Sequence, residues 1–245
     1  MQLTGQRVLV TGASSGLGRA LSIRLAEAGA IVLATARRLD RLEALAEAYP
    51  SIEPHRLDLT DVRAIADFCA DVGHLDGAVL NAGITAVEPF VDGSNIIDVA
   101  MVDTNIVANI RLTRGLVTAL QGGRLVLVGS MAGEVALPYQ AVYSGTKGFI
   151  RNFGLALGAE WAGDISVGVF APGGIATEMT DIDAMEKLKG QLADVEEVAS
   201  ALMTFYQSEQ RYSIPGRANR MSAYAARFLP APLISRMMER VFRSE

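Results

Sequence analysis

The sequence is poor in the residues that form disulfide frameworks and metal sites. Cys69 is the only cysteine among 245 residues, which excludes a disulfide framework and a cysteine-based zinc site. Two histidines, His55 and His74, are too few for a histidine-rich centre, so we expect no metal. Charged residues make up only 20% of the chain and hydrophobic residues 50%, a balance that excludes global disorder.

Long apolar runs and an overall basic charge are also missing. No run of about 18 apolar residues occurs, so no segment is predicted to span a membrane. The N-terminus lacks a basic region followed by an apolar core and a small-residue cleavage site, and the expected location is the cytoplasm. The net charge of −5 argues against nucleic acid as a partner.

Short apolar runs alternate with longer helical patterns along the chain, which is typical of parallel strands joined by crossover helices. The predicted strands are 7–11, 31–36, 55–57, 77–80, 124–128, 166–170 and 212–214. The predicted helices are 17–28, 39–49, 61–72, 96–120, 143–161 and 195–207. We therefore predict an α/β fold, a single doubly wound Rossmann domain whose central parallel sheet of about seven strands is flanked by helices on both faces.

A glycine-rich turn, Thr11 to Gly18, joins the first strand to the first helix, which is the context that dinucleotide binding requires. Gly12 permits a tight turn and Gly16 a close approach of the backbone to a pyrophosphate. Gly18 permits close helix–strand packing, and the helix N-terminus faces the phosphates. The weaker alternative is a glycine-rich turn without a ligand.

Two arginines, Arg37 and Arg38, follow the second strand, where an acidic residue would repel a 2′-phosphate. Guanidinium groups suit bidentate contact with phosphate, so this pair favours NADP(H) over NAD(H). The competing interpretation is that both are surface charges paired with Asp40 or Glu43.

Tyr143 and Lys147 lie four residues apart in a predicted helix and therefore share one face. A protonated lysine near a phenol lowers the tyrosine pKa from about 10, which makes tyrosine a usable general acid or base. Ser130 ends the fifth strand at the edge where ligands bind in parallel sheets, and its hydroxyl is placed to hold a carbonyl oxygen. Asn105 lies in the long helix, where a surface amide is the simpler interpretation for this residue alone.

Together these motifs resemble the classical short-chain dehydrogenase/reductase family over about residues 3–210. The residues that carry the resemblance, in family order and spacing, are Thr11 to Gly18, Asp58, Asn81-Ala82-Gly83, Asn105, Ser130, Tyr143, Lys147, Pro172-Gly173 and Thr177. The resemblance also implies a homodimer or homotetramer. Pro215 makes the last strand short, which puts the family's usual tetramer contact in doubt.

The resemblance implies roles for these residues. Tyr143 would exchange a proton with the substrate oxygen, and Lys147 would hold the nicotinamide ribose. Ser130 would orient the carbonyl, and Asn105 would support a water-linked proton path through Lys147. The implied cofactor-binding residues are Gly12, Ser14, Ser15, Gly16, Leu17, Gly18, Arg37, Arg38, Asp58, Leu59, Asn81, Ala82, Gly83, Tyr143, Lys147, Pro172, Gly173 and Thr177. Candidate pocket residues in the following segment are Met179, Ile182, Met185 and Leu188.

The C-terminal residues differ in composition from the rest. From Arg211 onward the chain holds seven arginines and two acidic residues, and apolar residues from Leu233 to Phe242 recur at helical spacing. We assign 1–210 to the dinucleotide-binding and catalytic part, and 211–245 to a basic amphipathic extension of the same domain. Packing is the favoured role of this helix, followed by closure over the substrate pocket and docking on an anionic membrane surface.

The sequence thus predicts an NADP(H)-dependent oxidoreductase that transfers a hydride between nicotinamide and a carbonyl or alcohol substrate. The apolar C-terminal residues favour a hydrophobic substrate. One alternative is a non-catalytic NADP(H)-binding regulator, although such a protein has no need of Tyr143. The other is an isomerase or epimerase that recycles its cofactor, although related epimerases are usually longer.

Overall fold

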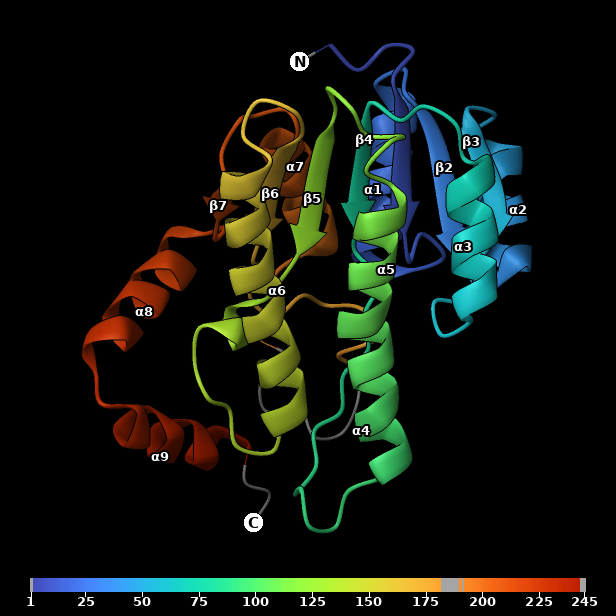
Figure 1. Ribbon diagram of the computed structural model, residues 1–245. Coiled ribbons are helices and arrows are strands. Elements are labelled where there is room, and N and C mark those ends of the chain that lie inside the picture. Colours follow the sequence, from blue (N-terminus) through green and yellow to red (C-terminus); the bar gives the residue numbers. More distant parts are fainter. Residues whose placement is uncertain (1, 182–189, 191, 243–245) are drawn as a thin grey trace.

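The computed structural model describes residues 2–181, 190 and 192–242, and its centre is one parallel sheet (Figure 1). The seven strands lie in the order β3-β2-β1-β4-β5-β6-β7, and every neighbouring pair is parallel. The strands are β1 (Arg7–Thr11), β2 (Ile31–Ala36), β3 (Ile52–Arg56), β4 (Gly77–Leu80), β5 (Arg124–Val128), β6 (Ser166–Phe170) and β7 (Tyr212–Ser213). The order reverses between β1 and β4, which confirms the doubly wound fold and places a ligand crevice at that point.

Helices cover both faces of the sheet, because alternate residues of each strand point to opposite sides. On one face, the side chains of Val8 and Val10 pack under α1 (Gly16–Glu27), α2 (Leu39–Ala48) and α7 (Val195–Tyr206). On the other, Leu9, Leu125 and Leu127 pack under α3 (Val62–Asp71), α5 (Ala108–Gly115) and α6 (Ala141–Glu160). The buried strands are apolar on both sides, as the near-continuous hydrophobic runs predict.

The long helix predicted over 96–120 is interrupted, so that prediction is wrong in detail. α4 (Asn95–Val102) passes into a π-helical turn, Asp103–Val107, before α5 begins. α5 ends at Gly115, where an added Cβ would lie 2.7 Å from Cys69 Sγ on α3, so the two helices cross closely there. π-turns inside helices are rare and occur mainly at functional sites, and this one contains Asn105.

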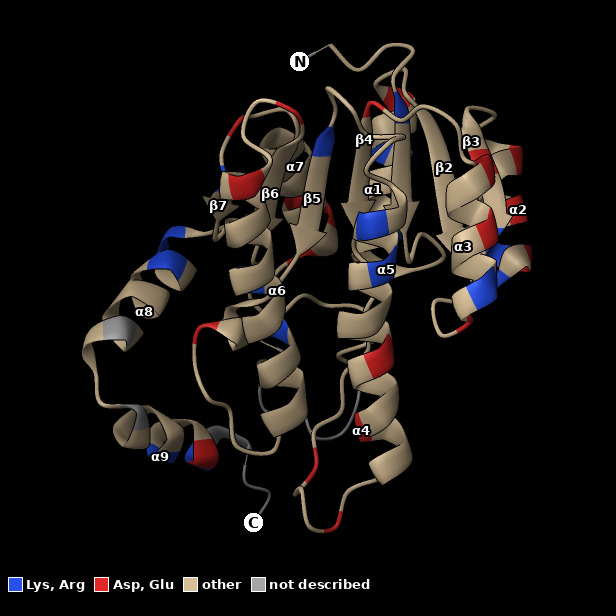
Figure 2. Cartoon of the chain, viewed as in Figure 1, with Lys and Arg blue, Asp and Glu red and all other residues tan. Residues whose placement is uncertain are grey.

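The C-terminal extension forms two helices where the sequence predicted one. α8 (Arg217–Phe228) follows Gly216, whose φ of +85° favours glycine, and α9 (Ala231–Phe242) follows Pro230. Both helices lie beyond β7 at the edge of the molecule (Figure 1) and both carry basic side chains (Figure 2). β7 has only two residues, in agreement with the expectation from Pro215.

Two further features of the elements bear on the sequence analysis. β3 begins earlier than predicted, at Ile52, and as an edge strand it accommodates Pro54, which has no N–H to donate. Within the described residues, no helix combines the length and the apolarity needed to cross a membrane.

Candidate active site

The glycine-rich turn has the backbone that the sequence predicts. Gly12 and Gly16 adopt φ values of +71° and +51°, which side-chain-bearing residues rarely adopt. An added Cβ on Gly18 would lie 2.4 Å from the Gly12 carbonyl oxygen, so α1 reaches the turn only because residue 18 is glycine. An added Cβ on Gly16 would lie 3.2 Å from Thr177 Cγ2, which places Thr177 directly across the turn.

Asn81 ties the ends of β1 and β4 together beside this turn. Its backbone N–H and that of Ala82 donate to Thr11 Oγ1, both at 3.0 Å, and its side-chain Nδ2 donates to the Thr11 carbonyl oxygen at 3.0 Å. The two central strands are therefore held at a fixed separation where the sheet order reverses.

One cavity of about 860 Å³ follows the carboxyl edge of the sheet from α2 to α9. All of the predicted cofactor-binding residues line it except Gly18, which packs behind the turn. Of the four predicted catalytic residues, Ser130, Tyr143 and Lys147 line it, and Asn105 lies beneath its wall. The chain thus brings together in one place residues that are spread from 12 to 177 in the sequence.

Ser130, Tyr143 and Lys147 converge at the centre of the cavity. Ser130 follows β5 and its Oγ accepts a hydrogen bond from Ala132 N at 3.1 Å, which fixes the hydroxyl at the start of a short 3-10 turn. Tyr143 and Lys147 lie in the first two turns of α6, with Lys147 Nζ 5.7 Å from the Tyr143 ring centroid. Lys147 Nζ donates to the Val128 carbonyl oxygen at 3.0 Å, so the ammonium group is anchored to the end of β5.

The pKa of Tyr143 is raised and not lowered, which corrects the expectation from Lys147. Burial disfavours the phenolate, and a hydrogen bond with Ser130 acts in the opposite direction without cancelling it. Burial also lowers the pKa of Lys147 to about 8. In the protein alone, Tyr143 therefore remains a protonated phenol at neutral pH, which is the form that donates a proton.

Asn105 is buried, with 1% of its surface exposed, so the surface-amide interpretation is wrong. Its Oδ1 accepts from Ile84 N at 2.9 Å, and its Nδ2 donates to Ile84 O at 2.9 Å and to Thr146 Oγ1 at 3.1 Å. An added Cβ on Gly83 would lie 3.2 Å from Asn105 Oδ1 and 3.4 Å from Lys147 Nζ. The π-turn thus positions Asn105 between the chain after β4 and the helix that carries Lys147.

Polar residues also cluster at the opposite end of the cavity. Asp58 Oδ1 accepts from the backbone N–H of Thr60 at 2.9 Å and from its hydroxyl at 2.8 Å. The hydrogen bond from the Thr60 backbone is the main cause of a lowered Asp58 pKa, and Arg37 and Arg56 contribute. Asp58, Leu59 and Arg37 line this part of the cavity.

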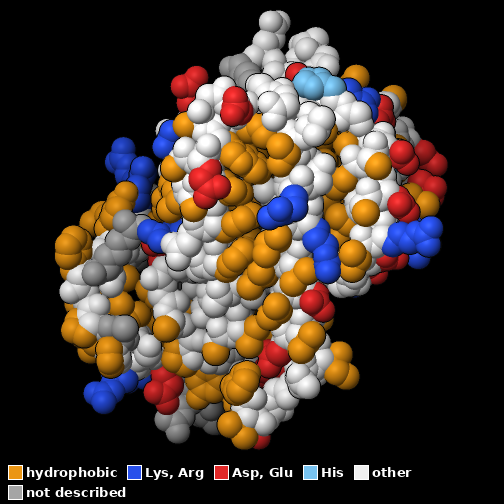
Figure 3. Space-filling view, viewed as in Figure 1, with side chains coloured by type: hydrophobic (Ala, Val, Ile, Leu, Met, Phe, Trp, Pro, Cys, Tyr) orange, Lys and Arg blue, Asp and Glu red, His pale blue; other side chains and the backbone are white. Residues whose placement is uncertain are grey.

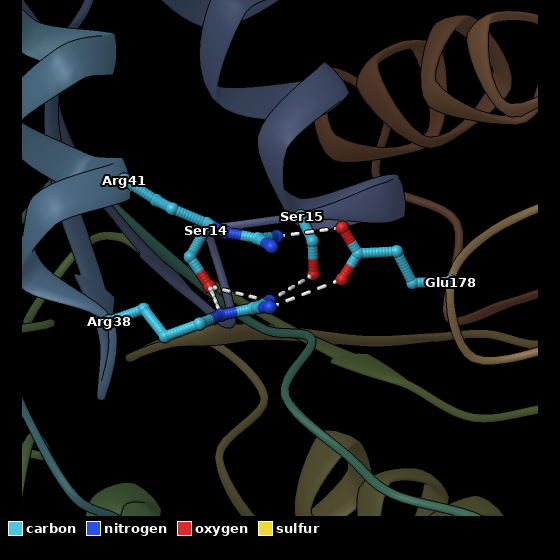
Figure 4. Close-up of polar contacts among 5 residues, drawn as sticks. All are labelled: Ser14, Ser15, Arg38, Arg41 and Glu178. Atoms are coloured by element: carbon cyan, nitrogen blue, oxygen red, sulfur yellow. Dashed lines mark hydrogen bonds and ion pairs between the residues drawn. The ribbon is translucent and has the colours of Figure 1, made fainter.

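The competing interpretation pairs Arg38 with Asp40 or Glu43. Among the described residues, Arg38 forms neither pair. It contacts Ser14 and Ser15 of the glycine-rich turn and forms an ion pair with Glu178 (Figure 4). The sequence analysis missed Glu178, because the contact joins positions 140 residues apart.

Further cavity residues come from the C-terminal helices. Asn219 of α8 packs against Gly173, where an added Cβ would lie 2.8 Å from Asn219 Nδ2. Ala223, Ile234, Met237 and Met238 line the cavity. The basic amphipathic pattern identified a helix there but not the surface it faces. Of the candidates after Thr177, Met179 lines the cavity, and Ile182, Met185 and Leu188 lie outside the described residues.

No three His, Cys, Asp or Glu side chains lie close enough to hold a metal ion in the part of the chain that the structure describes.

Comparison with known proteins shows the family to which the chain belongs. The family model described as short chain dehydrogenase matches residues 6–187. An uncharacterized oxidoreductase of Mycobacterium tuberculosis is 32% identical over 231 residues, which cover 88% of each protein. A short-chain dehydrogenase from Burkholderia cenocepacia, solved in complex with NADP, superposes with a TM-score of 0.84 at 25% identity over 97% of this chain and 99% of that one. The chain therefore belongs to the short-chain dehydrogenase family of oxidoreductases.

Another relative is longer than the present chain. The 11-beta-hydroxysteroid dehydrogenase 1A of Arabidopsis thaliana is 34% identical over 193 residues, which cover 73% of this chain and 54% of that protein. The chain thus matches about half the length of that curated relative.

Proposed function

We propose that the protein is an NADP(H)-dependent oxidoreductase that interconverts a carbonyl compound and its alcohol, with Ser130, Tyr143, Lys147 and Asn105 as its proton-handling residues. One observation carries this proposal: Ser130, Tyr143 and Lys147 meet in the same cavity as the glycine-rich turn. A dinucleotide bound at the turn would reach the phenol along the carboxyl edge of the sheet.

The shape and charge of the cavity support NADP(H) as the cofactor. Gly12 and Gly16 line the cavity at the N-terminus of α1, where backbone N–H groups are available to a pyrophosphate. Arg37 and Arg38 flank the position proposed for the adenosine ribose. Besides the Burkholderia cenocepacia structure, a similar serine dehydrogenase structure contains NADP+, and one from Sphingobium yanoikuyae contains NADPH. When bound, this cofactor supplies or accepts the hydride.

The chain's own residues supply position and the proton. The Ser130 hydroxyl holds the substrate oxygen, and the Tyr143 phenol donates its proton to that oxygen during reduction. The raised pKa of Tyr143 keeps this proton in place at neutral pH. Lys147 Nζ, fixed by the Val128 carbonyl oxygen, stabilises the phenolate left behind by its positive charge. Asn105 positions the helix turn around Lys147 through Thr146, and we assign it support for proton resupply.

The lining near Tyr143 favours an apolar substrate. An apolar wall of the cavity is built from two elements far apart in sequence, the segment after β5 and helices α8 and α9. The side chains that form this wall are Met131, Val135, Leu137, Leu229, Ile234, Met237 and Met238. Each Å² of apolar ligand surface buried against these side chains contributes about 25 cal/mol to the binding free energy. Helices α8 and α9 are therefore proposed to complete the substrate side of the same domain.

We also propose that the protein forms a homo-oligomer through α4 and α6. Exposed apolar residues gather on α4 and the loop before it, among them Val91 (92% exposed) and Ile96 (82%). Figure 3 shows hydrophobic side chains in a band over α4, α5 and α6. A patch of this kind on one face is typical of a protein–protein contact.

The test is to measure nicotinamide absorbance with purified protein, NADPH and NADH in parallel, and ketones and aldehydes graded from small to steroid-sized. Turnover that is faster with NADPH and increases with the apolar size of the carbonyl compound would support the proposal. Tight NADPH binding without turnover across the whole panel would contradict it and favour a cofactor-binding regulator.

A further inference from the structure

The Glu178 carboxylate, in the segment after β6, forms ion pairs with two arginines beside the glycine-rich turn. Glu178 Oε2 is 3.1 Å from Arg38 Nη1, and Glu178 Oε1 is 2.6 Å from Arg41 Nη1 (Figure 4). One carboxylate therefore bridges two guanidinium groups at the start of α2. Glu178 stands between Thr177, which lies against Gly16, and Met179, which lines the cavity.

Hydrogen bonds to the glycine-rich turn hold the Arg38 side of this contact. Arg38 Nη2 donates to Ser15 Oγ at 2.8 Å and to Ser14 Oγ at 3.2 Å, and Nε lies 3.3 Å from Ser14 Oγ. The guanidinium plane is thereby fixed against the turn and faces Glu178 (Figure 4). Arg38, Ser14, Ser15 and Glu178 all line the cavity, so these donors face the space proposed for the cofactor.

The donors that hold Glu178 are those that a phosphate monoester would use. Paired guanidinium groups bind carboxylate and phosphate with the same planar N–H geometry. A phosphate monoester carries a charge of about −1.5 to −2 near pH 7 and three acceptor oxygens, so it competes well against a single carboxylate. Arg41 and Arg38 lower the pKa of Glu178, so this competing carboxylate is ionised at neutral pH.

We propose that Glu178 is an intramolecular occupant of the 2′-phosphate site, and that Arg41 is a third guanidinium of that site beside Arg37 and Arg38. The inference rests on the proposed NADP(H) cofactor. A 2′-phosphate displaces the Glu178 carboxylate from Arg38 and Arg41, and a 2′-hydroxyl does not. Glu178 therefore determines how strongly the site discriminates between NADP(H) and NAD(H).

The size of the effect follows from the exposure of the contact. The Glu178 side chain is 59% exposed, and an ion pair of this kind is worth a factor of about two to five in an equilibrium constant. Removing the carboxylate charge in Glu178→Gln should therefore tighten NADP+ binding about fivefold. NAD+ binding should change less than twofold, because its ribose carries no phosphate that competes with Glu178.

The experiment is a calorimetric titration of the purified full chain with NADP+ and NAD+. Asp40→Asn is the matched control, because it removes the same charge from the first turn of α2, between the two arginines in sequence. If Glu178 acts by occupying the site, Glu178→Gln shifts the ratio of the two dissociation constants and Asp40→Asn does not. If only the general charge near α2 matters, the two variants shift this ratio equally, which would overturn the proposal.

A second variant tests Arg41. Arg41→Ala should weaken NADP+ binding about tenfold and leave NAD+ binding unchanged, because one of the guanidinium groups proposed to hold the phosphate is lost. In the Arg41→Ala background, Glu178→Gln should have a smaller effect than in the wild type, which is the coupling expected of residues in contact. The control is Arg63→Ala, since the exposed ion pair of Arg63 is with Asp67 on α3 and that of Arg41 is with Glu178.

The outcomes separate this inference from the proposed function. Equal changes in NADP+ and NAD+ affinity, or weaker NADP+ binding in Glu178→Gln, would refute the role of Glu178 and leave the oxidoreductase intact. Selective binding changes in a protein without turnover would support the role of Glu178 and refute the oxidoreductase. A wild type that binds neither dinucleotide would refute both.

Discussion

Substituting Asn105 with alanine should lower the free energy of unfolding by roughly 3 kcal/mol. The side chain makes three hydrogen bonds, two with the backbone of Ile84 and one with Thr146, and it is almost completely buried. Each such bond contributes about 1 kcal/mol, and a buried partner left without one costs at least as much. The substitution also removes the link between the chain after β4 and α6, so the position of Lys147 should loosen.

The assay is urea unfolding of both proteins, with Asn152→Ala as control. Asn152 is exposed on α6 and accepts one hydrogen bond from Arg151, so its loss should change stability by no more than about 0.5 kcal/mol. A loss for Asn105→Ala as small as that of the control would show that this amide is a surface residue. It would also refute the claim that the π-turn anchors the site.

Three further predictions follow from glycine packing, charge and burial. Gly18→Ala should lower stability by about 1–3 kcal/mol in urea unfolding, because its Cβ would meet the Gly12 carbonyl oxygen. The control is Gly145→Ala, which adds a methyl group to open space on α6 and should raise stability by up to about 1 kcal/mol. Equal effects of the two substitutions on stability would contradict the packing argument. Arg37→Ala should weaken NADPH binding about tenfold in calorimetry and spare NADH, whereas equal losses would exclude phosphate contact. Burial lowers the pKa of Lys147 from 10.5 to about 8. In the pH range between these two values, the unfolded chain therefore binds more protons than the folded protein. Wild-type stability measured against Lys147→Met should therefore rise with pH across this window, by on the order of 3 kcal/mol, and a fall would contradict the burial argument.

The sheet and most of the site could be predicted from local sequence. Near-continuous hydrophobic runs identify β1, β4 and β5, because strands covered on both faces must be apolar throughout. The glycine-rich turn is recognisable because its positive φ values and close approaches admit only glycine. The topological rule for parallel sheets then brings distant strand ends, such as Ser130 and Asn81, to one edge.

The features that were missed depend on contacts between distant residues. The π-turn at Asn105 is stabilised by the Ile84 backbone, 21 positions away, and leaves no local periodic signal. The ion pairs of Glu178 join residues about 140 positions apart. The raised pKa of Tyr143 follows from burial, whereas spacing alone reports only the nearby lysine. The helical spacing of apolar residues predicted α9. The surface that its apolar side covers depends on where the chain leaves β7.

The most direct test of the central claim compares Tyr143→Phe with the wild type, with Tyr49→Phe as the control. Tyr49 follows α2 and packs against the core away from the cavity. NADPH oxidation with an apolar ketone and NADPH binding by calorimetry are both measured. The account predicts that Tyr143→Phe loses turnover by at least about a hundredfold and still binds NADPH within a few fold of the wild type, while Tyr49→Phe retains both. Undiminished turnover in Tyr143→Phe would show that this phenol does not donate the proton.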